Sequence, residues 1–289
     1  MNLCYYHSSD LDGHCSGAII KNKFPNCKMI GINHGEKIDW DELKNYEDVY
    51  MVDFSLQPFW KMIKLNNKCN LIWIDHHKSS MEEYKKWNKS NINGLRRIGL
   101  GACALVWEYF YPVRRLPYAV KLLAEYDVWN HENPETLPFQ YGIKTEDTLP
   151  NSSIWPILFS YDNADFINKY VSRGNTILNY IDKENKKYAE ACHFVTELYD
   201  LKCIVINKMF TGSMLFESIW NPEEFDAMIT FGWMNNQWII SLYTSKNEID
   251  LSGIAKKLGE IYGSEPGGGH ANAAGCQVNN IDFLFENKV

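Results

Sequence analysis

The sequence contains no Cys-x-x-Cys pair, although eight cysteines are scattered over its 289 residues. Their irregular spacing fits neither a zinc site nor a disulfide framework. The cysteines are therefore predicted to be reduced thiols, most of them buried, as in proteins of a reducing compartment.

Long apolar runs are also missing. No segment reaches the roughly 18 apolar residues that a membrane-spanning helix needs. The first residues, Met1 to Tyr6, resemble a strand and lack the basic region and apolar stretch of a secretion signal. These features predict a cytoplasmic protein that does not bind membranes.

An excess of positive charge is absent as well, since the formal net charge is −7 at pH 7. Proteins that coat long DNA or RNA gain most of their affinity from a basic surface that displaces counterions. The charge therefore disfavours this function. A short oligonucleotide or a small nucleotide stays compatible as a partner, because bound cations reverse the local charge of an acidic cleft.

In the first half of the chain, short apolar runs alternate with helical patterns. The predicted strands are Leu3–Tyr6, Lys28–Ile32, Val49–Val52, Leu71–Ile74 and Leu95–Ile98. The predicted helices are His14–Lys23, Pro58–Asn66, Ala102–Tyr111 and Tyr118–Tyr126. Such alternation is typical of a parallel sheet covered on both faces. We therefore predict an α/β domain over residues 1–164.

The second half of the chain has a different composition. Between Asp165 and His193, apolar residues recur at helical spacing among Lys, Asn, Glu and Tyr, which predicts a helical linker over residues 165–195. The elements predicted beyond it are strands Cys203–Ile206, Ala227–Phe231 and Trp238–Leu242, helix Leu251–Leu258 and the glycine-rich segment Gly267–Gly269. We predict a second, smaller α/β domain over residues 196–289.

Aspartates and histidines gather at the ends of the predicted elements of the first domain. They are, in chain order, His7, Asp10, Asp12, Asp53, Asp75, His76, His77 and Asp127. Three groups of them follow three different strands. Because sites in open parallel sheets form beyond the carboxyl ends of the strands, we expect these side chains to converge.

Such a convergence is typical of a metal site. Several carboxylates brought together without cations would repel one another and resist desolvation. Carboxylate and imidazole ligands without cysteine favour manganese, with magnesium, iron or zinc as alternatives. The set exceeds the needs of one ion and fits two, about 3.5–4 Å apart, that share a carboxylate and activate a hydroxide. This pattern predicts metal-assisted hydrolysis of a phosphate ester.

Single residues have simpler interpretations. Asp10 or Asp53 alone is more often a helix cap or turn residue than a ligand. His14, which follows Asp12-Gly13, favours a capping or solvated role. Three other groups near the predicted site are candidates for substrate contact, with His34 lining the cleft, Arg96 or Arg97 meeting phosphate, and Trp129 stacking on a base.

Two motifs resemble a known family. Asp75-His76-His77, with the preceding His-x-x-Asp-x-Asp-Gly, resembles the DHH phosphoesterase superfamily, and Gly267-Gly-Gly-His270-Ala-Asn-Ala-Ala-Gly275 resembles its companion DHHA1 domain. Together the motifs span nearly the whole chain. The chain is most similar to the nanoRNase-like and oligoribonuclease-like branch. The resemblance implies a catalytic metal-binding domain followed by a substrate-binding domain.

The resemblance also implies roles for individual residues. The first ion would be bound by His7, Asp10 and Asp53. The second would be bound by Asp12, Asp53, His76 and Asp127, so Asp53 would bridge the two. His77 would contact the scissile phosphate, and Asp75 would orient an imidazole. Substrate binding in the second domain would fall to Gly267, Gly268, Gly269 and His270.

Hydrolysis of phosphodiester bonds in short oligonucleotides, as by an exonuclease, is the leading interpretation. A 3'-phosphoadenosine 5'-phosphate phosphatase or a phosphodiesterase for cyclic or linear dinucleotides stays open, because one metal site serves mono- and diesters. Inorganic pyrophosphatase activity is a further alternative. A nucleotide-binding regulator without catalysis is the alternative from another class. A homodimer is compatible with the sequence.

Overall fold

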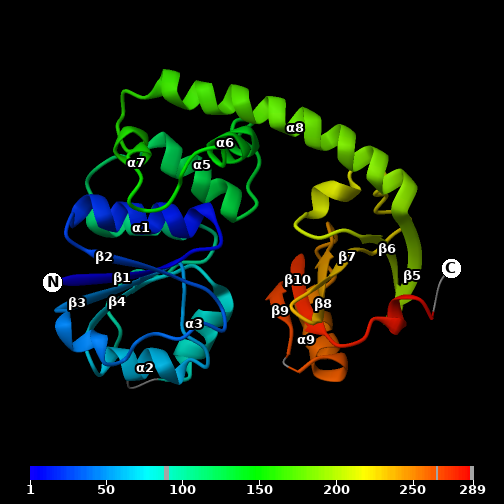
Figure 1. Cartoon of the computed structure of the whole chain (residues 1–289), viewed down its shortest axis with the longest axis horizontal. Coiled ribbons are helices and arrows are strands. Elements are labelled where there is room, and N and C mark those ends of the chain that lie inside the picture. The colour runs from blue at the N-terminus through cyan, green and yellow to red at the C-terminus, as the bar shows by residue number, and fades with distance from the viewer. Residues whose placement is uncertain (88–90, 265, 287–289) are drawn as a thin grey trace. The chain divides into compact units, whose positions relative to one another are not determined.

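A computed structural model of the chain describes residues 1–87, 91–264 and 266–286. The chain divides into two compact units, Met1–Leu178 and Asn179–Val289, each described here by itself (Figure 1). The division falls within one long helix, α8 (Ala164–Cys192), which spans most of the helical linker that the sequence predicted. Each unit combines a sheet with helices, so the predicted α/β class is confirmed.

The first unit is built on four parallel strands in the order β2-β1-β3-β4. Their bounds are β1 Asn2–His7, β2 Lys28–Ile32, β3 Asp48–Val52 and β4 Asn70–Ile74. The chain moves from β1 to β2 on one side and then crosses to β3 on the other. The strand order therefore reverses at β1, and ligand sites of open α/β sheets lie at such a reversal, beyond the carboxyl ends.

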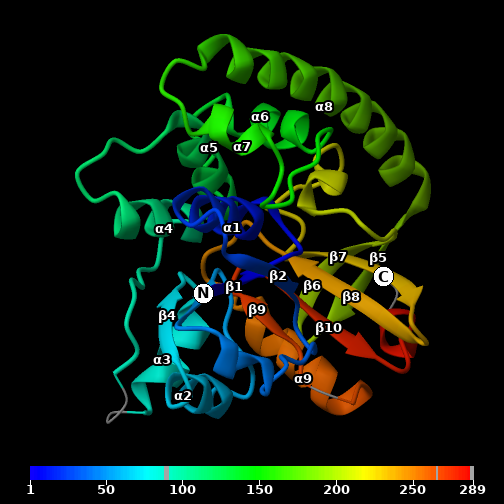
Figure 2. The same ribbon diagram turned by 60° about the vertical axis from the view of Figure 1, so that its left-hand side comes forward.

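Helices cover both faces of this sheet (Figures 1 and 2). Alternate strand residues point to opposite faces, so two separate cores form. One core joins Cys4, Tyr50 and Ile74 to helices α1 (Leu11–Lys23), α4 (Ala102–Phe110) and α5 (Tyr118–Asp127). The other joins Leu3, Met51 and Trp73 to helix α2 (Trp60–Asn66). The sheet is thus buried on both faces, which keeps its strand ends in place.

The predicted strand Leu95–Ile98 is wrong. This segment runs beside β4 with only two isolated bridges, between Ile72 and Asn93 and between Asp75 and Arg96. Gly94 has φ +125° and lies so close to the chain that a Cβ there would meet the Trp73 carbonyl oxygen at 1.9 Å. Because strand residues need a negative φ, this glycine interrupts regular pairing.

The first unit also contains several shorter elements. They are helices α3 (Lys78–Lys85), α6 (Thr136–Ile143) and α7 (Ile154–Leu158), and the 3₁₀ turn η1 (Glu42–Asn45). Helices α6 and α8 approach closely through Gly142 and Gly174. A Cβ at Gly174 would meet the Pro138 carbonyl oxygen at 1.7 Å. This contact holds α6 against the first part of α8.

The second unit contains a six-stranded mixed sheet in the order β5-β6-β7-β8-β10-β9. Its strands are β5 His193–Leu198, β6 Leu201–Asn207, β7 Ala227–Met234, β8 Gln237–Tyr243, β9 Gly268–His270 and β10 Ala273–Val278. Its other elements are helix α9 (Leu251–Tyr262) and the 3₁₀ turns η2 (Ser213–Phe216) and η3 (Asp282–Leu284). Leu251, Ala255 and Leu258 of α9 are buried in the core of this unit. The predicted second α/β unit is therefore present.

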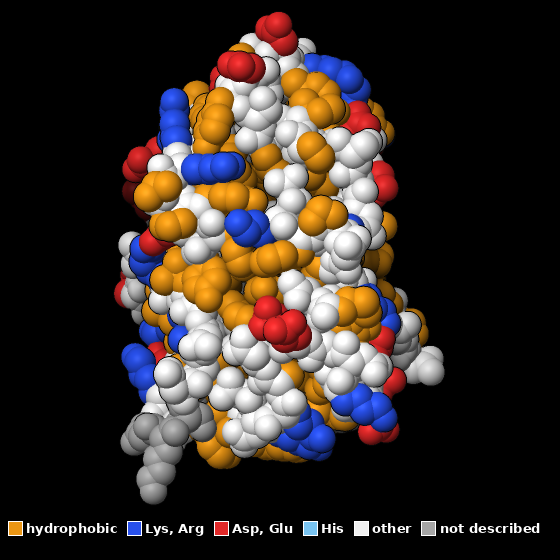
Figure 3. All heavy atoms as spheres, turned by 90° about the vertical axis from the view of Figure 1, so that its left-hand side faces the viewer, with side chains coloured by type: hydrophobic (Ala, Val, Ile, Leu, Met, Phe, Trp, Pro, Cys, Tyr) orange, Lys and Arg blue, Asp and Glu red, His pale blue; other side chains and the backbone are white. Residues whose placement is uncertain are grey.

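Among the described residues, no helix combines the length and apolar character needed to cross a bilayer. On the face drawn in Figure 3, basic and acidic side chains are scattered among apolar ones. The described residues of this face therefore present no continuous basic surface, in keeping with the net charge.

Candidate metal centre

The strand ends of the first unit carry the candidate ligands. His7 is the last residue of β1, Asp53 follows β3, and Asp75, His76 and His77 follow β4. The remaining carboxylates are those of Asp10 and Asp12 at the start of α1 and of Asp127 at the end of α5. Three overlapping groups have ligand atoms within 4.8 Å of one another: His7, Asp10 and Asp53; Asp12, His76 and Asp127; and Asp53, His76 and His77.

Asp53 lies between two of these groups. Its Oδ2 atom is 3.6 Å from His7 Nδ1, which is 2.8 Å from Asp10 Oδ2. Its Oδ1 atom is 3.3 Å from His76 Nε2, which is 3.1 Å from Asp127 Oδ2. Asp12 Oδ2 lies 3.9 Å from the same imidazole nitrogen. The two oxygens of one carboxylate therefore face two different ligand groups.

The backbone at Asp53 places its side chain inward. Its amide donates to the Ile74 carbonyl at 2.9 Å, continuing the pairing of β3 with β4. Its φ of +56° is left-handed, a conformation that costs roughly 1–2 kcal/mol for most residues and that Asp and Asn tolerate best. The side chain is almost wholly buried, at 1% exposure. Local strain thus accompanies the central position of this carboxylate.

Helix caps position the carboxylates of Asp10 and Asp12. Asp10 is the N-cap of α1, where its Oδ1 accepts a hydrogen bond from Gly13 N at 2.8 Å. Asp12 reaches across to the first residues of α4 and accepts from Ala102 N at 2.6 Å and Cys103 N at 2.8 Å. Helix N-termini stabilise negative charge. The capping role therefore holds these carboxylates where a cation could bind them.

Asp75 organises the histidines that follow it. Its Oδ1 accepts hydrogen bonds from the amides of His76, at 2.7 Å, and His77, at 3.2 Å, and lies 2.7 Å from His77 Nδ1. Its Oδ2 accepts from Trp73 Nε1 at 3.1 Å. Burial raises the pKa of Asp75, but these contacts outweigh it and the net pKa is lowered. This wholly buried carboxylate therefore orients the His77 ring.

Comparison with known proteins adds a fold assignment to this geometry. No family model matches the chain. The DHH domain of a protein from a family of ribosomal proteins superposes with a TM-score of 0.61, at 14% identity, over 96% of this chain and 82% of that one. The chain has the DHH fold. A pGpG-specific phosphodiesterase from Vibrio cholerae shares this fold at a TM-score of 0.51 and 13% identity, over 96% and 92% of the two chains.

One curated relative has a similar sequence. It is an uncharacterized protein of Acanthamoeba polyphaga mimivirus, 24% identical over 251 residues. The match covers 83% of this chain, which spans about half the length of that relative, 55%. The motif-based prediction of the DHH fold is confirmed by the solved structures.

Burial and mutual repulsion shift the pKa values of the carboxylates in the candidate metal centre. Burial raises the pKa of Asp12 to about 7, and the charge of Asp53 adds to this effect. Burial and the charge of Asp12 likewise raise the pKa of Asp127 to about 7. Burial lowers the pKa of His7 and of His76, but neighbouring carboxylates outweigh it and raise both to about 10. The cluster therefore retains protons that a metal cation would replace.

Two buried atoms indicate that the cluster fits cations better than internal hydrogen bonds. His7 Nδ1 and Asp53 Oδ1 are buried and have no hydrogen-bond partner among the described residues. Asp10 Oδ2 lies 2.8 Å from His7 Nδ1, and His76 Nε2 lies 3.3 Å from Asp53 Oδ1, but neither pair has the angles of a hydrogen bond. Buried polar atoms without partners are costly, and metal coordination would satisfy them. Carboxylate oxygen and imidazole nitrogen suit manganese and related divalent ions.

Stabilisation by manganese is expected to be larger at pH 8 than at pH 6. Below a pKa of about 7, Asp12 and Asp127 hold protons that the ion must displace, and above it they are ionised and ready to bind. Melting temperatures measured with and without Mn²⁺ at both pH values test this expectation. Chelator should remove the difference. An equal or smaller shift at pH 8 would contradict the proton competition.

The other histidines near the candidate metal centre have different partners. Both ring nitrogens of His14 are engaged, Nδ1 with Thr148 Oγ1 at 2.9 Å and Nε2 with the Ser8 carbonyl at 3.1 Å. His14 thus fastens the loop after β1 rather than facing a cation. His34 packs its ring against Phe54, at 5.1 Å between centroids, and against His7, at 6.0 Å. It borders the first ligand group.

Both arginines considered for phosphate contact bind other groups of the protein. Arg96 donates to the backbone carbonyls of Trp73 and Ile92, both at 2.9 Å. Its guanidinium also lies 5.0 Å from the Trp73 ring. Arg97 forms an exposed ion pair with Glu108. Arg96 therefore fastens the segment after Gly94 to β4, and this contact accounts for its position near the site.

The glycine motif lies in the second unit. Gly268–His270 forms β9, which pairs only with β10 in the described sheet. A Cβ at Gly267 would meet the Ala255 carbonyl oxygen at 2.3 Å, and Gly269 has φ +140°. Both glycines thus serve the packing of this unit, whereas Gly268 has open space around it. Substrate binding by Gly267, Gly268, Gly269 and His270 stays a prediction from the resemblance.

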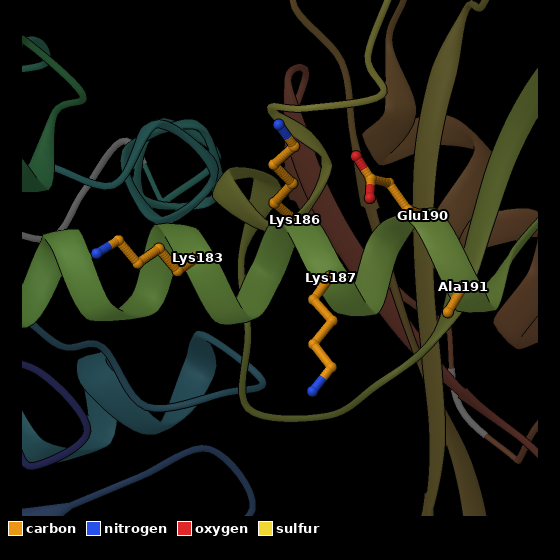
Figure 4. A pocket seen from close by; sticks show the side chains of 5 residues that line it. All are labelled: Lys183, Lys186, Lys187, Glu190 and Ala191. Atoms are coloured by element: carbon orange, nitrogen blue, oxygen red, sulfur yellow. The ribbon is translucent and has the colours of Figure 1, made fainter.

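A hollow of about 470 Å³ lies along α8 and is lined by Lys183, Lys186, Lys187, Glu190 and Ala191 (Figure 4). The three ammonium groups point in different directions rather than toward a common point. Exposed lysines that diverge do not form a phosphate site, so we assign this hollow no ligand.

Proposed function

We propose that the chain is a metal-dependent phosphodiesterase that hydrolyses short oligonucleotides. The observation that carries the proposal is the position of Asp53, whose two oxygens face two separate groups of ligand atoms. One carboxylate shared between two ions is the arrangement that a dinuclear hydrolytic site requires. The buried unpaired atoms His7 Nδ1 and Asp53 Oδ1 support metal binding independently.

The groups of ligand atoms support an assignment of residues to each proposed ion. His7, Asp10 and Asp53 would hold the first ion, and Asp12, Asp53, His76 and Asp127 would hold the second. Two bound divalent ions, for which we propose manganese, would supply charge compensation at phosphorus and activation of water. The caps on Asp10 and Asp12 keep the ligand oxygens in place before substrate arrives.

His77 is assigned to the scissile phosphate. Asp75 lies 2.7 Å from its Nδ1, which fixes the ring orientation. Burial lowers the pKa of His77, but the hydrogen bond and charge of Asp75 outweigh it and raise the pKa. The ring therefore carries a proton more readily than an isolated histidine. A protonated imidazole can pair with the negative charge that develops on the phosphate oxygens.

The proposed substrate class rests on the net charge of the chain and on the fold that it shares with a known phosphodiesterase. The acidic chain is unsuited to coating long nucleic acid, and the fold is shared with a phosphodiesterase specific for the linear dinucleotide pGpG. Short linear oligonucleotides are therefore the proposed substrates. Activity on 3'-phosphoadenosine 5'-phosphate or cyclic dinucleotides is the alternative within the same chemistry.

Purified protein with added Mn²⁺ is expected to release mononucleotides from 5'-phosphorylated dinucleotides. A product assay would compare these with a long single strand, 3'-phosphoadenosine 5'-phosphate and a cyclic dinucleotide, each with and without chelator. We expect chelator-sensitive cleavage to be fastest on the dinucleotides. If Mn²⁺ binds but no compound is hydrolysed, the protein is a nucleotide-binding regulator or acts on another phosphoester.

A further inference from the structure

Beside the metal centre, the end of α5 carries a group of aromatic rings. Trp129, two residues after Asp127, lies 4.4 Å from the His131 ring and 6.2 Å from the Tyr126 ring, measured between centroids. The His131 ring stacks on Tyr126 at 5.6 Å and 19°. Trp129 is 59% exposed. A large aromatic surface therefore faces solvent next to a proposed metal ligand.

The backbone conformation at Trp129 indicates that a tryptophan does not stabilise the fold at this position. Trp129 N donates to Tyr126 O at 3.0 Å and Asn130 N donates to Glu125 O at 2.8 Å, the hydrogen bonds of a Schellman motif that ends a helix. Trp129 occupies the left-handed position of this motif, with φ +58°. Glycine is preferred there because a side chain adds strain. An exposed tryptophan at this position gains little burial in return, so strain points to a functional role.

Two polar groups lie near these rings. His131 Nε2 is buried and has no hydrogen-bond partner in the described parts of the chain. Lys144, at the end of α6, lies 5.3 Å from the Tyr141 ring and 6.0 Å from the Tyr126 ring. Desolvation lowers the pKa of Lys144, and the charge of Asp10 opposes this effect.

We propose that Trp129, His131 and Lys144 form a subsite for a nucleoside phosphate. A nucleobase would stack on the Trp129 ring, His131 Nε2 would hydrogen-bond to the nucleoside, and Lys144 would pair with a phosphate. This inference rests on the proposed function, since the ligand would be a substrate or product nucleotide. It also selects a base-bearing ligand over inorganic polyphosphate or pyrophosphate, which offer nothing to stack.

The test measures binding rather than hydrolysis. Calorimetry in the presence of Mn²⁺ would compare adenosine 5'-monophosphate with ribose 5-phosphate, which keeps the sugar and phosphate but lacks the base. The wild-type protein is expected to bind the adenosine compound roughly 5- to 150-fold more tightly, the range for one base stacked on an aromatic ring. Trp129→Gly should remove most of this difference, and Lys144→Met should weaken both ligands alike.

The melting temperature of the Trp129→Gly variant distinguishes a binding role of Trp129 from a structural one. Trp129→Gly is expected to leave the melting temperature unchanged or to raise it, because glycine suits the left-handed position. Matched controls are Trp87→Ala, an exposed tryptophan beyond the far end of α3 from His77, and Lys64→Met, a lysine 4.3 Å from the Trp40 ring. Both controls should retain the preference for the base.

The outcomes distinguish this subsite from the proposed activity. Base-dependent binding lost in Trp129→Gly supports the subsite even if no phosphoester in the panel is hydrolysed. Equal affinity of the wild-type protein for the two ligands, or binding of neither, overturns the subsite even if dinucleotides are hydrolysed. A Trp129→Gly variant that melts earlier and loses affinity for both ligands equally would assign the ring to structure alone.

Discussion

Replacing Asp53 with asparagine is expected to abolish turnover. Asp53 supplies one oxygen toward His7 and the other toward His76. An amide retains one oxygen ligand and presents an NH₂ group on the other side, so it cannot bridge two cations. Because the metals compensate charge in the transition state, we expect kcat to fall about 1,000-fold or more, equivalent to roughly 4 kcal/mol.

The same substitution should leave the fold intact. Asparagine tolerates the left-handed backbone that Asp53 adopts, at φ +56°. It also removes one negative charge from a cluster in which burial, with added repulsion from Asp10 and Asp127, raises the pKa of Asp53. The substitution also removes the attraction between Asp53 and the imidazoles of His7 and His76, whose pKa values this carboxylate helps to raise. Because the two effects oppose each other, the metal-free variant is expected to melt close to the metal-free wild type, while its stabilisation by Mn²⁺ is lost.

A matched control exists in the hairpin between β5 and β6. Asp200 is exposed and adopts a similar left-handed conformation, with φ +64°. Asp200→Asn makes the same chemical change and should retain both turnover and stabilisation by Mn²⁺. Rates and melting curves of both variants test the assignment. Retention of more than a few per cent of activity in Asp53→Asn would contradict the bridging role.

Asp75→Asn is the second variant with a large expected effect. Asp75 holds no proposed cation directly but positions His77 through Nδ1. An asparagine oxygen can keep the contacts of Oδ1, but its NH₂ group then faces the Trp73 Nε1–H, a second donor. The neutral amide also no longer raises the pKa of His77 by its charge, so the ring holds its proton less readily. Loss of a supporting partner of this kind lowers metal-site activity roughly 10- to 100-fold. We expect kcat to fall in this range with a smaller change in KM.

Stability should fall in the same variant, since two buried donors would oppose each other, at a cost of roughly 1–3 kcal/mol. Asp226→Asn is the control, because this carboxylate also accepts a backbone amide, from Lys202 at 2.9 Å, but belongs to the second unit. It should lose stability without a matching loss of kcat beyond that caused by unfolding. If Asp75→Asn loses stability but keeps its kcat, Asp75 has no positioning role.

The sequence predicted those strands that have a clear local pattern of apolar and turn residues. Strands β1 to β4 were predictable because each is a short apolar run followed by polar residues. Strand β5 was missed, since it follows α8 directly and its turn to β6 is Tyr199-Asp200, with φ +49° and +64°. Two left-handed residues usually call for Asn or Gly, so this hairpin carries no turn signal. The Asn235-Asn236 turn between β7 and β8 does carry it.

Sequence alone determined the ligand types and the edge at which they meet. His7, Asp53 and His76 follow strands whose apolar patterns are readable, and parallel strands end at one edge. It also determined the likeness to the DHH fold through its motifs. These properties depend on local order along the chain, so they need no knowledge of distant contacts.

Only the tertiary structure decided which backbone groups hold the buried carboxylates and which basic residues bind other parts of the protein. Asp12 depends on the amides of Ala102 and Cys103, about ninety residues away, and Arg96 on the carbonyl of Trp73. Lys144 reaches the Tyr126 ring, 6.0 Å away, through the packing of α6 against α5. Such contacts arise from the pairing of segments distant in sequence, for which hydrophobic periodicity contains no information.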